Sequence, residues 1–304
     1  MRPLTYNYAG YTSDVKSYLQ SIPPTLKPLP LAGPNFANYD QWMLNFSSFT
    51  RDFGSEFTMF NYHRYPLVAC GGKQVTMADL LDENATARVG TSVAGFASMA
   101  RSLNKPFRVS ETNSVACGGT NGVSNSFGSA LWGLDILFEY LNAGVSGANF
   151  HGGGTYTYYS PVASKNGELI VNPLYYGMVA FANATPKDAL LLKAVPQYQN
   201  PSLKAWATLD PQNTLRVVLI NKSAVSGNVD ITPSDFRSLA RVEYLTAPAL
   251  TSTNGVNIGG YTYDGSSSGQ ALGASISQTY KSLNGKFTIP VAAGTAATVT
   301  IPQG

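Results

Sequence analysis

Short apolar runs alternate with longer amphipathic stretches between Leu29 and Ala184. Such alternation is typical of parallel strands joined by helical crossovers. We expect strands within residues 29–37, 57–66, 106–114 and 147–154, and helices within residues 39–53, 76–103, 126–144 and 172–184. Asn172 and Pro173 suit the cap and the first turn of the last helix. A further helix is predicted over residues 11–22, ahead of the first strand.

After about Ala189 the helical period is lost, and short runs that alternate apolar and polar residues take its place. This period of two, with turns rich in Gly, Asn, Asp and Ser, predicts a β-sandwich. The runs are residues 203–210, 215–222, 241–247 and 286–302. We therefore expect two domains, an α/β domain in residues 1–186 and an all-β sandwich domain in residues 187–304.

The composition favours a secreted globular protein. Of 304 residues 44% are hydrophobic, enough for a large core, and only 12% are charged, which leaves a mostly neutral polar surface. Four Asn-x-Ser/Thr sequences fit secretion, at Asn45, Asn84, Asn183 and Asn221. No signal-peptide pattern and no membrane-length apolar run occurs, so an export signal is expected from elsewhere.

The distribution of charge and cysteine narrows the possible partners. A net charge of +3 without basic runs argues against nucleic-acid and membrane partners, because such binding needs clustered Lys and Arg. The two cysteines, Cys70 and Cys117, are too few for a disulfide scaffold and lack metal-ligand spacing. They form either one bridge or two buried thiols.

Polar residues stand at the ends of the four predicted strands, where βα-barrel enzymes place their active sites. The runs end at Asn35, at residues 62–65, at residues 111–113 and at His151. A lone His is usually structural, and a lone Glu after a strand is usually a capping or surface charge. Here both histidines of the chain share the rim with Glu111, and nearby Tyr and Asn can bind sugar hydroxyls. The combination favours a glycosidase.

Other chemistries have weaker support. Two histidines on separate strands with one carboxylate show no metal-ligand spacing, so we expect no metal and no cofactor. The glycines at 152–154 lack the offsets of a phosphate-binding loop. Ser110 and Ser114 flank Glu111, but neither lies in a G-x-S-x-G elbow, which argues against acyl transfer.

These segments resemble glycoside hydrolase family 79, the β-glucuronidases and heparanase among the retaining (β/α)8 glycosidases. "SETNSVACGG" is similar to the nucleophile strand of that family, "NYHRYP" to its sixth strand, and "GANFHGG" with "NPLYYGMVAFA" to its eighth strand and helix. The resemblance covers essentially the whole chain. It implies the C-terminal half of a (β/α)8 TIM barrel, strands five to eight, followed by a β-sandwich domain.

The resemblance also implies roles for single residues. Glu111 would be the nucleophile, which forms a glycosyl-enzyme that water hydrolyses with retention. His63 and Tyr65 would line the sugar subsite, His151 and Tyr158 would meet the uronate carboxylate, and two glycines would face it with backbone N–H groups. Together with the strand-end Asn35, the expected substrate-binding residues are Asn35, His63, Tyr65, Gly118, Gly119, His151 and Tyr158. Each could instead be a packing or turn residue, and only their joint occurrence favours a site.

Two departures from the family pattern matter. Ala116 stands where the family commonly has a Tyr, so a hydroxyl that helps to bind the carboxylate is missing. Family members carry the acid/base Glu shortly before a segment similar to "RPLTYNYAGYTSDVKSYL", which opens this sequence, so we expect that proton donor and the first four strands to be absent. We do not expect another carboxylate of the chain to replace this proton donor; those considered are Asp40, Glu56, Asp135 and Glu139.

Three hypotheses follow. The first is a secreted retaining hydrolase of β-glucuronidase type that acts on a glucuronide-bearing glycan through Glu111, with the chain as given inactive or a fragment. The second is a non-catalytic carbohydrate-binding pseudoenzyme, and the third is a structural β-rich protein. In the barrel that the resemblance implies, Cys70 and Cys117 follow neighbouring strands, so we predict a disulfide between them.

Overall fold

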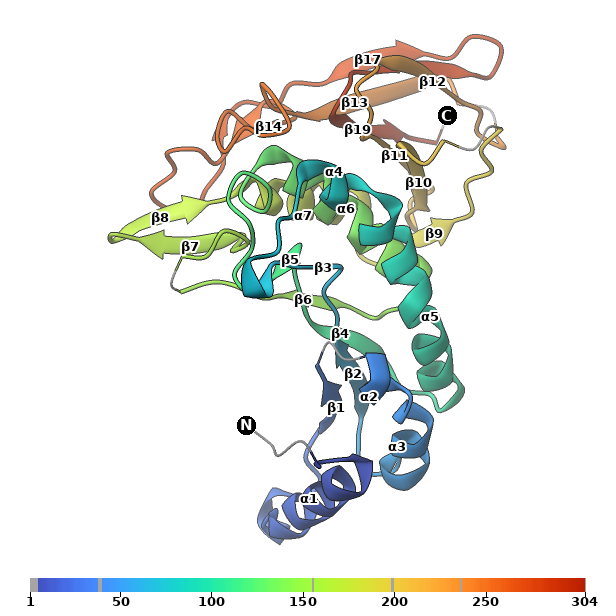
Figure 1. The fold of residues 1–304 in the computed structure, drawn as a ribbon. Coiled ribbons are helices and arrows are strands. Elements are labelled where there is room, and N and C mark those ends of the chain that lie inside the picture. Colours follow the sequence, from blue (N-terminus) through green and yellow to red (C-terminus); the bar gives the residue numbers. More distant parts are fainter. Residues whose placement is uncertain (1–4, 38–39, 155, 198–199, 236, 304) are drawn as a thin grey trace.

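The computed structural model describes residues 5–37, 40–154, 156–197, 200–235 and 237–303. A parallel sheet lies towards one end of the molecule and a large antiparallel sheet at the other, with helices α6 and α7 between them (Figure 1). The chain is thus a mixed α/β protein with a sheet-rich C-terminal part.

The parallel sheet has the strand order β1-β2-β4-β6, and all three pairings are parallel. Each predicted N-terminal strand segment contains one of these strands, so the four predictions are confirmed. The strands are β1 (Ala32–Phe36), β2 (Met59–His63), β4 (Phe107–Thr112) and β6 (Ala148–Phe150).

Local polar residues divide two of the predicted helices. Residues 39–53 form two helices. The prediction of a single helix over 76–103 is wrong, because Asp82 adopts an extended backbone after α4 and its carboxylate accepts a hydrogen bond from the Asn84 amide. Asn7 accepts a hydrogen bond from the Gly10 amide, which starts the first helix three residues earlier than predicted. The helices are α1 (Tyr8–Ser21), α2 (Asp40–Met43), α3 (Phe46–Phe53), α4 (Met77–Leu81), α5 (Ala87–Ser102), α6 (Phe127–Asn142) and α7 (Pro173–Ala184), and the 3₁₀ turns are η1 (Pro24–Leu26), η2 (Cys70–Gly72) and η3 (Glu83–Ala85).

One face of the parallel sheet is covered by an aromatic core. Phe46 on α3 packs edge-on against Phe60 of β2 and Phe107 of β4, with ring centroids 5.6 and 5.7 Å apart. Trp132 and Tyr140 of α6 extend the same core. Helices on this face hold the strands in place, so that their polar ends project together at one edge of the sheet.

Two short pairings were not predicted from the sequence. Strands β3 (Leu67–Val68) and β5 (Val115–Ala116) pair in parallel, and β7 (Val162–Lys165) with β8 (Glu168–Val171) forms a hairpin. Asn172 occupies the cap position of α7 as expected, but its side chain donates to the Ser160 carbonyl at 2.6 Å instead of capping the helix.

The C-terminal part has two layers. Nine strands form one sheet, and the β12–β18 pair forms a second, with a common core of apolar side chains from both. The run predicted over 286–302 forms two strands, since the chain turns at Gly294 with a φ of 60°. The strands are β9 (Leu190–Leu192), β10 (Leu203–Leu209), β11 (Leu215–Asn221), β12 (Gly227–Ile231), β13 (Leu239–Thr246), β14 (Asn257–Ile258), β15 (Tyr261–Thr262), β16 (Leu272–Gly273), β17 (Gln278–Lys281), β18 (Phe287–Val291) and β19 (Thr295–Ile301).

Helix α6 lies between the two sheets and has no solvent-exposed face. Thirteen of its 16 residues are buried, which explains why apolar residues occur on all of its faces. Trp132 packs in the core of the parallel sheet, whereas Phe138 stacks on Trp206 of the large sheet with centroids 5.5 Å apart. The predicted domain boundary after residue 186 falls between α7 and β9 and stays a prediction.

A buried ionic cluster also joins α6 to the large sheet. Lys222 lies 3.0 Å from Asp135 and 2.9 Å from Glu83, and Lys204 lies 2.9 Å from Glu83 and 2.8 Å from Glu139. Burial raises the pKa of Glu139. For Glu83 the two ammonium groups more than offset burial and lower the pKa. In the described part of the chain, no helix has both the length and the apolar character needed to cross a bilayer.

Candidate active site

Glu111 lies near the carboxyl end of β4, directly opposite His63 of β2 in the register of the two strands. The Tyr65 hydroxyl donates a 2.8 Å hydrogen bond to Glu111 Oε1, and His63 Nδ1 lies 3.4 Å from Oε2. A third of the Glu111 side chain is exposed. The structure therefore brings three of the predicted site residues together around a carboxylate that is held by two neighbours and is still partly exposed.

Tyr65 is suited to hold this carboxylate. Burial raises the pKa of its phenol well above the ordinary value, and the adjacent Glu111 raises it further. The hydroxyl thus stays protonated and continues to donate to Glu111.

His151 joins the same group through a residue that the sequence did not single out. Its backbone N–H donates to the Thr112 carbonyl at 2.8 Å, and its Nδ1 is hydrogen-bonded to the Tyr159 hydroxyl. Tyr159 is buried and its ring centroid lies 6.4 Å from that of Tyr65. Burial raises the pKa of Tyr159, which keeps it protonated. The Tyr-rich run at 156–159 was the only signal for this residue, and it does not say which ring turns inward.

Tyr158, the tyrosine expected in the site, is placed differently. Its side chain is 40% exposed and lines a neighbouring pocket, while its backbone N–H donates to the Gly118 carbonyl at 3.0 Å. Tyr158 thus lies beside the Glu111 group, and Tyr159 lies within it.

The two expected glycines have different backbone partners. Both follow Cys117 in a run of positive φ angles, 71°, 90° and 83° for residues 117–119. The Gly119 N–H donates to the Val115 carbonyl at 3.1 Å, and a Cβ there would lie 2.9 Å from the Tyr159 nitrogen. Gly118 borders open space, and its backbone is hydrogen-bonded to the Tyr159 side chain. The Gly118 backbone is thus linked to the Tyr159 side chain of the Glu111 group, whereas the Gly119 amide is used within its own loop.

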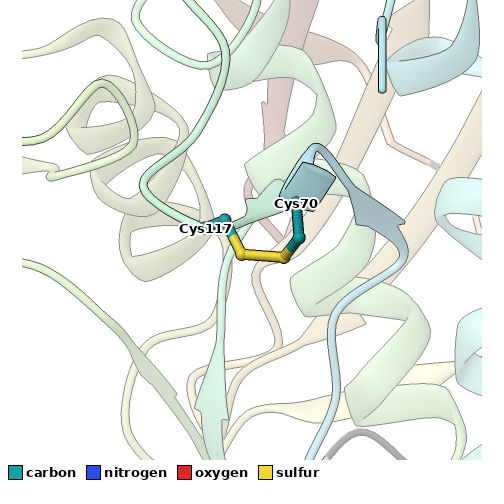
Figure 2. The surroundings of a disulfide bond; sticks show 2 residues. All are labelled: Cys70 and Cys117. Atoms are coloured by element: carbon teal, nitrogen blue, oxygen red, sulfur yellow. A yellow bond between two sulfur atoms is a disulfide. The ribbon is translucent and has the colours of Figure 1, made fainter. Parts of the chain in front are cut away.

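A disulfide between Cys70 and Cys117 anchors this loop (Figure 2). The Cα atoms are 5.4 Å apart, within the usual range for such a bond. The bond joins η2 to the end of β5, beside the parallel β3–β5 pairing. The run of left-handed residues is therefore tied to the segment that carries His63 and Tyr65.

Asn35 lies two strands away from Glu111 and has a φ of 58°. Its N–H donates to Asn61 Oδ1 at 2.8 Å, and its Oδ1 accepts from Ser110 Oγ at 2.9 Å. Asn35 is therefore linked to the strand of Glu111 through Ser110, and no described hydrogen bond joins it to Glu111 itself.

The other carboxylates considered from the sequence lie elsewhere. Asp135 and Glu139 belong to the ionic cluster on α6, and Glu56 is exposed before β2, at the opposite end of that strand from His63. Asp40 starts α2 as expected, but its side chain lies outside the described residues. Nowhere in the described ranges do three or more His, Cys, Asp or Glu side chains gather as metal ligands would.

Comparison with known proteins finds glycoside hydrolases. Residues 205–298 match the family described as the glycosyl hydrolase family 79 C-terminal beta domain. A β-glucuronidase of Neurospora crassa is 33% identical over 129 residues, which cover 38% of this chain and 23% of that protein. The C-terminal part of this chain thus matches glycoside hydrolase family 79. A second β-glucuronidase, of Aspergillus niger, is 32% identical over 141 residues, which cover 43% of this chain and 26% of that protein.

Solved structures share the fold. A 4-O-α-L-rhamnosyl-β-D-glucuronidase of Fusarium oxysporum, in complex with Rha-GlcA, aligns with this chain at a TM-score of 0.80 and 23% identity, covering 96% of the chain and 64% of that structure. A GH51 arabinofuranosidase of Xanthomonas axonopodis aligns at 0.64 and 14% identity, covering 97% and 63%. The sequence matches span about a quarter of the two curated relatives.

Proposed function

We propose that this chain is the nucleophile-bearing part of a secreted retaining glycoside hydrolase of β-glucuronidase type, which acts on terminal β-glucuronides of a glycan. The observation that carries the proposal is the Glu111 carboxylate, which Tyr65 and His63 hold at a strand end and which is still one-third exposed. The two curated relatives that share about a third of their aligned residues with it are named β-glucuronidases.

In the proposed reaction a Glu111 oxygen attacks the anomeric carbon, the bond to the leaving group breaks, and a glycosyl ester forms. Water then attacks the same carbon from the opposite face and releases Glu111, so the configuration is retained. Tyr65 donates to the carboxylate in the free state and holds it in one orientation. His151 and Gly118 would meet the uronate carboxylate from the neighbouring strand end and loop.

The four parallel strands are proposed to be strands five to eight of a (β/α)8 barrel. Their order, their parallel direction and the helices on one face support this assignment. The polar residues lie at the carboxyl ends of the strands, where this fold carries its active sites. Residues 187–304 would be the β-sandwich domain.

We propose further that the acid/base residue is none of the described carboxylates. A retaining enzyme needs a second carboxyl about 5 to 5.5 Å from the nucleophile. Asp135 and Glu139 are bound to lysines on the far face of α6, and Glu56 lies at the other end of its strand. Leaving groups that need a proton should therefore react about 100-fold to 10,000-fold more slowly with this chain alone.

An activated substrate separates the nucleophile from the missing acid. 2,4-Dinitrophenyl β-glucuronide needs no protonation of its leaving group, and azide can replace water in the second step. We expect azide-dependent turnover to the β-glucuronosyl azide, an adduct on the Glu111 peptide by mass spectrometry, and neither with Glu111→Gln. Glu56→Gln is the matched control and should behave as the unaltered chain. Turnover that survives Glu111→Gln would refute the proposal.

The absence of a described carboxylate opposite Glu111 favours a second candidate, a carbohydrate-binding pseudoenzyme. This candidate predicts that calorimetry detects binding of a glucuronide while the dinitrophenyl substrate gives no azide product. Binding together with azide product would eliminate it.

A further inference from the structure

Strand β4 carries one residue more than its neighbours just where Glu111 stands. Two consecutive residues of β2, 62 and 63, pair with Val109 and Glu111 of β4, so Ser110 is the extra residue. The pairing of β4 with β6 also shifts by one residue in this part of the strand. Such an insertion is a β-bulge, which is uncommon between parallel strands and changes the direction of the side chains beside it.

This bulge decides which face of the sheet Glu111 occupies. Val109 lies in the aromatic core on the helix-covered face, and the Thr112 hydroxyl is hydrogen-bonded to Tyr140 of α6 on that same face. In a regular strand residues two apart share a face, so without the insertion Glu111 would follow Val109 towards the helices. The insertion turns both Ser110 and Glu111 to the opposite face, where each has its hydrogen-bond partner.

A second bulge, on β1, supports the first. Asn35 is the extra residue there, since Pro34 and Phe36 pair with consecutive residues of β2. Ser110 Oγ donates to Asn35 Oδ1 at 2.9 Å across the intervening strand β2, and the Asn35 N–H donates to Asn61 Oδ1 at 2.8 Å. Asn61 is buried within β2. The extra residues of the two bulges are thus bonded to each other above a buried side chain that fixes the position of Asn35.

We propose, building on the function proposed above, that Ser110 and Asn35 are positioning residues, whose hydrogen bond holds the bulge that aims the Glu111 carboxylate at the substrate. This role differs from the substrate contact expected for Asn35 from the sequence, because Asn35 acts here through Ser110 and Glu111. Misplacing a reacting group by about 1 Å can slow a reaction about 100-fold. Loss of the bond should therefore slow the attack by Glu111 and leave substrate binding unchanged.

Single-turnover kinetics separates these two effects. With the protein in excess over 2,4-dinitrophenyl β-glucuronide, the maximal rate of dinitrophenolate release measures the attack by Glu111, and the protein concentration at half the maximal rate gives Kd. We expect Ser110→Ala to lower the maximal rate about 10-fold to 100-fold without changing Kd. Ser110→Thr keeps the hydroxyl and should restore most of the rate. An unchanged rate in Ser110→Ala would overturn the proposal.

Two further variants make the test specific. Ser146→Ala is the matched control and should keep the full rate, because the Ser146 hydroxyl donates a 2.8 Å hydrogen bond to the Phe107 carbonyl at the other end of β4. Asn35→Gly removes the acceptor of the Ser110 bond, and glycine tolerates the φ of 58° at position 35. It should lose as much rate as Ser110→Ala, and the double variant should lose no more, since both residues act through one bond. Additive losses, or a Kd that rises in Asn35→Gly, would indicate a separate substrate contact and overturn the proposal.

Failure of the proposed function has a different signature. If the unaltered chain releases no dinitrophenolate, or if Glu111→Gln releases it equally fast, Glu111 is not the nucleophile. Crystal structures of Ser110→Ala and Ser146→Ala then decide the role of the bulge. We expect Glu111 Oε1 to leave hydrogen-bond distance of the Tyr65 hydroxyl in Ser110→Ala and to remain at about 2.8 Å in Ser146→Ala. A Glu111 that does not move in Ser110→Ala would overturn the inference, and Asn35→Gly serves for the same measurement if Ser110→Ala does not fold.

Discussion

The Tyr65 hydroxyl donates a 2.8 Å hydrogen bond to Glu111 Oε1, across 46 positions of sequence. The two residues come from neighbouring strand ends, since β2 and β4 pair in parallel with His63 opposite Glu111. Burial and the carboxylate both raise the pKa of Tyr65, so the phenol keeps the proton that it donates in this bond.

Replacing Tyr65 by Phe should slow the proposed reaction without unfolding the chain. A hydrogen bond to a charged group contributes about 1.5–3 kcal/mol, so azide-dependent turnover of the dinitrophenyl substrate should fall about 10-fold to 100-fold. Tyr140→Phe is the matched control, because its buried hydroxyl contacts Thr112 Oγ1 at 3.2 Å behind the strand. Equal losses of turnover in both variants would contradict the role of Tyr65.

The disulfide should contribute to both stability and substrate binding. It closes a loop with a sequence separation of 47, for which its removal is expected to cost about 4 kcal/mol. In the double variant Cys70→Ala, Cys117→Gly, glycine tolerates the φ of 71° at position 117. Urea unfolding should show the loss, and KM for the dinitrophenyl substrate should rise as the Gly118 loop loosens. An unchanged free energy of unfolding would be inconsistent with this prediction.

Lys222→Met should destabilise the junction between α6 and the large sheet. The Lys222 side chain is 2% exposed and its partner Asp135 is fully buried, so removing the ammonium group leaves an uncompensated charge at a cost of about 3–5 kcal/mol. Adding Asp135→Leu should recover part of this loss. Lys286→Met is the control, since Lys286 and Asp230 are about half exposed and their pair should contribute less than about 1 kcal/mol. Equal urea midpoints for the two single variants would refute the prediction.

Asp210 should make the β-rich part sensitive to acid. Burial alone would raise the pKa of its carboxyl, but hydrogen bonds from Arg216 and from the Thr214 and Gln212 amides more than offset it and lower the pKa. A lowered folded-state pKa stabilises the fold above the unfolded pKa, and this contribution is lost as the pH falls through the folded value. Thermal melts between pH about 6 and about 2 should therefore show that Asp210→Asn loses less stability in acid than the unaltered chain. The control Glu168→Gln, on exposed β8, should lose as much stability in acid as the unaltered chain. An equal loss in Asp210→Asn would refute the assignment of acid sensitivity to Asp210.

If the protein is secreted through a eukaryotic pathway, its four sequons should differ in use. Asn221 is buried, and its Nδ2 donates to the Val225, Val291 and Ala292 carbonyls, which leaves no room for a glycan. Asn84 and Asn183 are exposed. Glycopeptide mass spectrometry should find glycans at the exposed sites and none at Asn221, and a glycan on Asn221 in folded protein would contradict the packing.

The sequence by itself determined the order of the elements and the group of strand-end residues. Apolar runs followed by helical stretches indicated four parallel strands, and all four were found. Because parallel strands end at the same edge of a sheet, the alternation alone predicted that His63, Glu111 and His151 share one rim.

Only the tertiary structure decided which of those residues touch. It placed Tyr159 rather than Tyr158 against His151, and it paired the Gly119 amide with a carbonyl of its own loop. It also ended the helix predicted over 76–103 at Asp82. These features depend on how a loop folds back and on single side-chain hydrogen bonds, which leave no periodic signal in the sequence. Periodicity reports which face of an element is buried, whereas the partner on that face is set by packing between residues far apart in the chain.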